Sequence, residues 1–162
     1  MKLTASSSTL SLLYSSKHVI PPVAARYMGS PTHPIAPKIT HAWMTRDRNA
    51  LWWRVSVSHI TQLKRVIRSW CARRARLAFE QALKDKGFDH LGTPLPSSTL
   101  LPPQDALTGS LDLIVRPSLA KQSFKTVQQD AHSVLESLLK QRAVHNRVVS
   151  KGSEVPPGFE RA

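Results

Sequence analysis

The segment SHITQLKRVIRSWCARRARLAFEQALKDK, residues 58–86, has the clearest periodicity in the chain. Apolar side chains recur in it at three- and four-residue spacing, which predicts one long helix with Ser58 as its N-cap and Gly87 just after its end. The expected apolar face consists of Ile60, Leu63, Ile67, Trp70 and Leu77, continued at its flank by Ala78 and Ala82. This face predicts a helix that packs on a hydrophobic core.

The other side of the same helix is basic. A helical wheel groups four arginines opposite the apolar face, with lysines at the margins: Arg65, Arg68, Arg73, Arg76, Lys64 and Lys86. A row of cations on a helix suits the phosphates of a nucleic-acid backbone, and a merely solvated basic face is the competing interpretation. Arg74 departs from the pattern, because it falls among the apolar positions, where an unpaired charge is costly to bury.

Three of the four tryptophans, Trp43, Trp52 and Trp53, lie just before this segment and are flanked by arginines. Indole rings beside guanidinium groups are used to stack on unpaired bases. They also serve as core anchors in small domains, and this second interpretation is favoured. Trp52 and Trp53 are kept as candidates for base stacking.

Two further elements follow in the chain. Residues 110–115 alternate apolar and polar side chains, which predicts a short strand, and residues 52–57 are its expected partner. Residues 123–144 predict a second amphipathic helix. The expected fold is therefore mainly α with a possible small two-stranded β element (α+β), built on two long amphipathic helices; whether the two strands pair is left open.

The N-terminal part has a different composition. Residues 1–46 contain no acid and are rich in serine, which is typical of a mitochondrial transit peptide, although a disordered tail has the same character. The three prolines in residues 29–42 predict an extended linker. The expected organisation is a disordered presequence and linker (1–42), one small folded domain (43–145) and a flexible C-terminal tail (146–162).

The overall composition limits the function. The chain has 23 Lys and Arg against 10 Asp and Glu, a formal charge of +13 that predicts an acidic partner. Its single cysteine excludes an internal disulfide and a paired-cysteine metal site. No phosphate-binding, nucleophile or metalloprotease motif is present, so no enzyme activity, metal or cofactor is expected.

These observations predict a non-catalytic RNA-contacting protein of the mitochondrial matrix, either a ribosomal component or an accessory factor of translation or ribosome assembly. The expected RNA-binding residues are Lys64, Arg65, Arg68, Arg73 and Arg76, with Trp52 and Trp53 adding stacking. The alternative is a matrix or inner-membrane assembly factor whose basic helix docks on an acidic protein or on anionic lipid. A nuclear or cytosolic location also remains open, as do the partner's identity and the oligomeric state.

Overall fold

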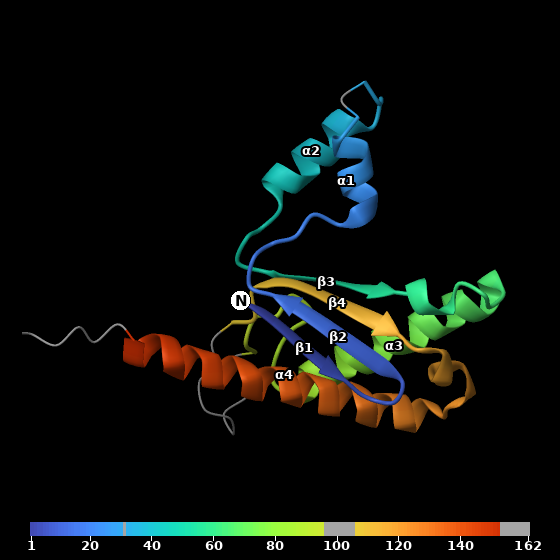
Figure 1. The fold of residues 1–162 in the computed structure, drawn as a ribbon, viewed down its shortest axis with the longest axis vertical. Coiled ribbons are helices and arrows are strands. Elements are labelled where there is room, and N and C mark those ends of the chain that lie inside the picture. Colours follow the sequence, from blue (N-terminus) through green and yellow to red (C-terminus); the bar gives the residue numbers. More distant parts are fainter. Residues whose placement is uncertain (31, 96–105, 153–162) are drawn as a thin grey trace, which may run out of the picture.

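The computed structural model describes residues 1–30, 32–95 and 106–152 (Figure 1). In chain order its elements are β1 (Lys2–Ser6), β2 (Leu10–Ser15), α1 (Pro22–Met28), α2 (Ala36–Thr45), β3 (Leu51–Ser56), the 3-10 helix η1 (Ser58–Ile60), α3 (Arg65–Asp85), β4 (Gly109–Val115), the 3-10 helix η2 (Pro117–Lys121) and α4 (Phe124–Gly152).

The strands form one mixed sheet of four strands in the order β1-β2-β4-β3. The neighbours β1–β2 and β2–β4 are antiparallel, whereas β3 and β4 run parallel and are connected through α3. The sequence left open whether residues 52–57 and 110–115 pair, and the structure shows that they do, with Trp53 opposite Leu111 and Val55 opposite Leu113. The fold class is nevertheless α/β, and the expected mainly α fold with a two-stranded element is wrong.

The missing strands come from the N-terminal segment, which was expected to be disordered. Leu10, Leu12 and Tyr14 alternate with less buried residues along β2, and all three are buried beneath the helices. This is the two-residue period of a half-buried strand. Short polar serines between the leucines made the segment resemble a presequence, but in the sheet they take the positions away from the core.

Residues 36–42 of the predicted extended linker instead belong to helix α2, and the residues just before the linker form helix α1. Both α1 and α2 carry proline at one of their first two positions, where a missing N–H costs nothing and the fixed φ favours a helix start. The two helices form a hairpin that projects beyond the end of the sheet, away from α3 and α4 (Figure 1).

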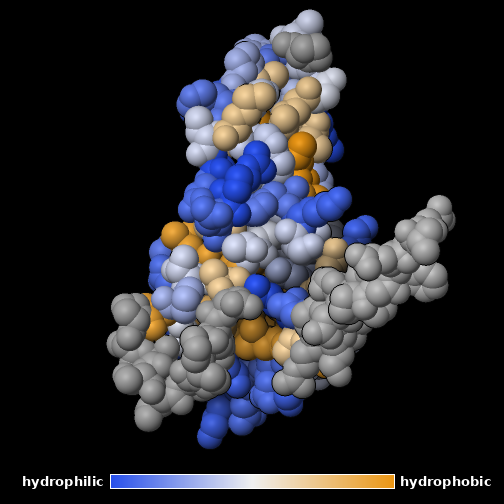
Figure 2. Space-filling model, turned by 90° about the vertical axis from the view of Figure 1, so that its left-hand side faces the viewer, coloured by the Kyte–Doolittle hydropathy of each residue, from blue (hydrophilic) through white to orange (hydrophobic). Residues whose placement is uncertain are grey.

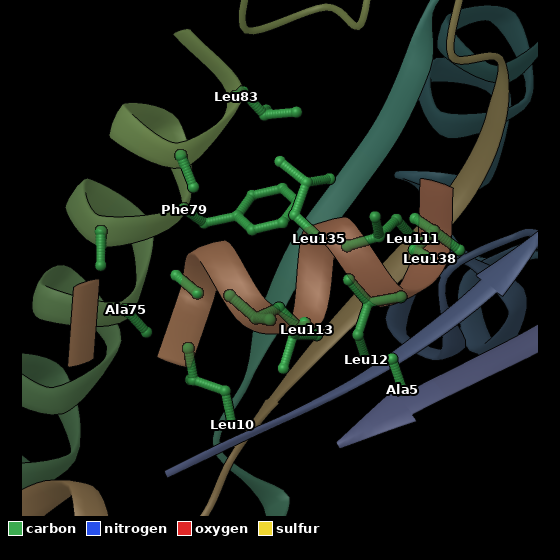
Figure 3. Close-up of a cluster of buried hydrophobic side chains, with 14 of the residues drawn as sticks. Ala5, Leu10, Leu12, Ala75, Phe79, Leu83, Leu111, Leu113, Leu135 and Leu138 are labelled. Carbon is green, nitrogen blue, oxygen red and sulfur yellow. The ribbon is translucent and has the colours of Figure 1, made fainter. Parts of the chain in front are cut away.

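Helices α3 and α4 cover one face of the sheet, and the core lies between them and the strands (Figure 1). Figure 3 shows Phe79 and Leu83 of α3 meeting Leu135 of α4 above the strand side chains. The predicted second helix is confirmed and extends further, to Gly152. Of its expected core positions Leu139 is partly buried and Phe124 is exposed, whereas the others are buried: Val127, Ala131, Val134, Leu135 and Leu138. The expected tail, residues 146–162, therefore overlaps α4, and residues 153–162 lie outside the described part of the chain.

Helix α3 differs from the prediction in its start and in its buried face. Lys64 has an extended backbone (φ −56°, ψ 146°), so the helix begins at Arg65 after the separate η1 turn rather than at Ser58. The side buried against the sheet and α4 consists of Cys71, Arg74, Ala75, Ala78, Phe79, Ala82 and Leu83. The expected apolar face is largely outside, since Trp70 is 46% and Leu77 52% exposed. Small alanines let the helix approach the sheet closely, and this preference outweighs the size of the apolar side chains.

Candidate nucleic-acid interface

The outer side of α3 carries a group of cations with free access to solvent. Lys64, Arg65, Arg73 and Arg76 are all exposed, and we call these four residues the basic face. Arg68 is different, because it is half-buried and its Nε atom is buried with no hydrogen-bond partner. Among the described residues, every ion pair is made by groups other than these five.

Most acidic side chains of the described residues contact groups outside the basic face. Asp112 pairs with Arg54 at 2.6 Å across β3 and β4, and Glu136 contacts Lys140 at 2.8 Å and Lys86 at 3.7 Å. Asp130 accepts hydrogen bonds from Ser8 and Thr9 in the turn between β1 and β2. Glu80 is half-buried on α3 and follows Arg76 by four residues, so it is the acidic residue closest in sequence to the basic face. The positive charge of the basic face is therefore largely uncompensated within the described residues.

Arg74 is the exception among the arginines of α3, because it is only 9% exposed. Its guanidinium donates hydrogen bonds to the carbonyl oxygens of Gln122 (2.9 Å) and Leu119 (3.5 Å), at the end of η2. It also lies over the indole of Trp70, 4.4 Å from the ring centroid. The carbonyl end of a helical turn and an aromatic face both favour a cation, which explains how the charge is tolerated at an apolar position.

The two candidate stacking residues lie on opposite faces of the sheet. Trp52 is on the face not covered by α3 and α4, is 6% exposed, and donates from Nε1 to the Asp47 carbonyl at 2.8 Å. Trp53 packs toward the helices, with its ring centroid 5.0 Å from that of Phe79, and its Nε1 donates to the His90 carbonyl. The structure thus groups the cations predicted for RNA binding on α3 but does not bring Trp52 to them.

Trp52 instead belongs to a cluster of rings and guanidinium groups at the base of the α1–α2 hairpin. His18 and Trp43 meet it at centroid distances of 4.2 and 4.8 Å, and Arg46 and Arg48 lie over its ring at 4.4 and 5.0 Å. Figure 2 shows a band of hydrophilic residues where the hairpin joins the rest of the molecule, with hydrophobic residues on the hairpin above it. Trp52 is therefore mainly a packing residue that fixes the base of the hairpin.

The open face of the sheet also holds a pocket of about 350 Å³ that the sequence did not predict. Leu13, Trp52 and Ile20 supply apolar walls, and the Arg54–Asp112 pair supplies polar groups. Asp112 Oδ1 is buried, and no described residue donates a hydrogen bond to it. The pocket could hold a flat apolar ring with an N–H donor. Its residues come from four separate stretches of the chain, so no local motif could reveal it.

Other chemistry has little support in the described residues. They contain no group of three metal-ligating side chains, and none of their helices is both long and apolar enough to cross a bilayer. Cys71 is fully buried, and this burial raises the pKa of its thiol above the ordinary value, although the nearby Arg74 charge opposes the shift. A buried thiol of this kind is a poor nucleophile. No family model, curated protein or solved structure matches the chain.

Proposed function

We propose that the protein binds RNA without catalysis, through contacts between the basic face of α3 and backbone phosphates. The observation that supports this proposal is that Lys64, Arg65, Arg73 and Arg76 are exposed and have no ion-pair partner among the described residues, on a helix whose opposite side is anchored in the core. Cations that are already neutralised by internal carboxylates would add little to the affinity for a phosphate chain.

The geometry of the basic face suits a polyanion better than a single small anion. The helix rises 1.5 Å per residue, so Arg65 and Arg76 are separated by about 16 Å along its axis. That span matches several consecutive phosphates, and each neutralised phosphate releases condensed counterions. Such contacts give affinity that depends strongly on salt and little on base sequence. Arg68 is expected to contribute less, because it is half-buried.

Within this proposal the protein acts in the mitochondrial matrix, as a ribosomal component or as an accessory factor of translation or ribosome assembly. The charge of +13 supports the partner. The location rests only on the acid-free composition of residues 1–46, since β1 and β2 of this segment belong to the sheet. Nuclease treatment of a mitochondrial extract tests the assignment. Release of the protein from a large particle supports it, and retention on membranes after RNA digestion favours the assembly-factor alternative.

The direct test is an RNA titration of the full chain, followed by fluorescence anisotropy at several salt concentrations. We expect the logarithm of the affinity to fall with the logarithm of salt with a slope of about −3, as four contacts to single-stranded phosphates predict. The triple variant Arg65→Ala, Arg73→Ala, Arg76→Ala is expected to bind about 100-fold more weakly near 0.1 M salt, because most of these contacts are gone.

The matched control removes the same charge from another part of the surface. Lys17, Arg26 and Lys38 are exposed and lie outside α3, so their replacement by alanine also lowers the net charge by three. The control variant is expected to keep most of the affinity. If both triple variants lose affinity equally, the net charge alone is responsible and the assignment to α3 is wrong.

A further inference from the structure

Trp70 lies on the exposed apolar side of α3, beside the basic face. We propose that Trp70 is a stacking platform for an unpaired base, so that the RNA bound by α3 is single-stranded at this position. The inference rests on the proposed function and deepens it, because it names the kind of RNA that the helix takes.

Trp70 is exposed to a degree unusual for a large aromatic residue near a core. It is 46% exposed, and so are Val66, one turn before it, and Leu77, two turns after it on the same side of the helix. Arg73 follows three residues later, which places it next to Trp70 on the helix surface. An aromatic ring, apolar surroundings and a cation are therefore adjacent on one solvent-facing strip.

The ring is also held in place from behind. The Arg74 guanidinium lies 4.4 Å from the Trp70 centroid and 5.9 Å from that of Phe124, between the two rings. Arg74 itself is fixed by its hydrogen bonds to the Leu119 and Gln122 carbonyls. The indole is thus covered on the guanidinium side, while nearly half of its surface stays open. A braced ring loses little conformational entropy when a ligand stacks on it.

The charges around Trp70 favour a nucleic acid over an apolar partner. Arg65, Arg73 and Arg76 lie on the adjacent side of α3, and a base stacked on Trp70 would bring its own phosphate toward Arg73. Stacking needs a free base face, which a base inside a duplex does not offer. A partner helix or a second copy of the chain could also cover Val66, Trp70 and Leu77, and the experiment includes that outcome.

The test compares two RNAs and two substitutions in the full chain. The RNAs are a 12-nucleotide strand without self-complementarity and the same strand annealed to its complement. We expect Trp70→Leu to weaken binding of the single strand about tenfold, as the loss of one stacked base predicts, and to leave duplex binding unchanged. Trp70→Phe should retain most of the affinity, because it keeps an aromatic face.

Two readouts separate stacking from a change in the fold. An RNA with abasic sites should bind wild type and Trp70→Leu equally, and quenching of tryptophan fluorescence by the single strand should be lost in Trp70→Phe but kept in Trp43→Phe. The inference is overturned if Trp70→Leu binds the single strand like wild type, if it weakens both RNAs equally, or if the free protein forms a dimer that depends on Trp70. If the arginine triple variant loses RNA while Trp70→Leu does not, the proposed function stands and only the stacking site is wrong.

Discussion

Arg74 brings a positive charge into the interior, and the described residues give it no carboxylate partner. Two carbonyl oxygens at the end of η2 and the faces of two rings take the place of an acid. From the sequence, Arg74 appeared as a conflict between charge and an apolar helix face. The conflict was real, but the resolution depends on residues 119–124, which are distant in sequence, so no local pattern could predict it.

Asp130 is a partly buried negative charge that hydrogen bonds stabilise in a similar way. Its Oδ2 accepts hydrogen bonds from the Thr9 backbone N–H (2.9 Å), the Thr9 hydroxyl (2.5 Å) and the Ser8 hydroxyl (2.7 Å). Partial burial raises the pKa of Asp130, but the hydrogen bonds from Thr9 and Ser8 lower it by more, so that it lies below the ordinary value. This carboxylate fastens the turn between β1 and β2 to α4.

A depressed pKa predicts the sign of the pH dependence. The stabilisation is fully present above the unfolded pKa of about 3.9 and is lost as the pH falls through the lower folded pKa. We therefore expect Asp130→Ala to lower the free energy of unfolding by about 2 kcal/mol at pH 7, and the gap from wild type to close at strongly acidic pH. Urea denaturation at several pH values measures this. A gap that is constant from pH 7 to pH 2 would contradict the role of the ionised form.

At the level of elements, α3 has two apolar sides, and either of them could pack on a hydrophobic core. The sequence correctly predicted a long helix with a basic side, but it assigned the core to the side with the larger side chains. Periodicity predicts that α3 has an apolar strip. Which of its two strips faces the core depends on how closely the helix can approach the sheet. Arg65, Arg73 and Arg76 belong to neither strip, and all three are exposed in the structure.

Two substitutions in adjacent positions distinguish the two orientations. Ala78 is fully buried and Leu77 is half exposed, so Ala78→Leu should cost about 2 kcal/mol by overpacking, while Leu77→Ala should change stability by less than about 0.5 kcal/mol. Chemical denaturation of both variants gives the comparison. The originally expected orientation would produce the reverse order, with Leu77→Ala the more damaging change.

At the level of the whole molecule, the N-terminal segment is part of the sheet. β2 pairs with both β1 and β4, and Leu10, Leu12 and Tyr14 are buried in the core. The compositional prediction of a presequence considered only residue types and missed the alternation along residues 10–14. A strand of this length is recognisable mainly through its partners, and β4 is almost 100 residues away in the sequence.

The fold makes a prediction about processing. Cleavage near residue 28 would remove two of the four strands and expose both the edge of β4 and the side of α4 that packs on β1 and β2, so a chain lacking residues 1–28 should fail to fold. We expect circular dichroism of that variant to show no cooperative thermal transition, and intact-mass measurement of the protein recovered from cells to show that β1 and β2 are kept. A stable, cooperatively folding truncated chain would contradict the structural role of the segment.

The position of β4 has a consequence for biosynthesis. Among the strands in the described part of the chain it is the last in sequence, yet it lies between β2 and β3 and is the strand there with which β3 pairs. The sheet therefore cannot close while the chain is still being translated as far as residue 108, and such late, long-range pairing makes folding slow. A nascent polypeptide whose sheet closes this late leaves its apolar segments exposed to solvent for longer, and such exposure favours aggregation unless chaperones cover these segments.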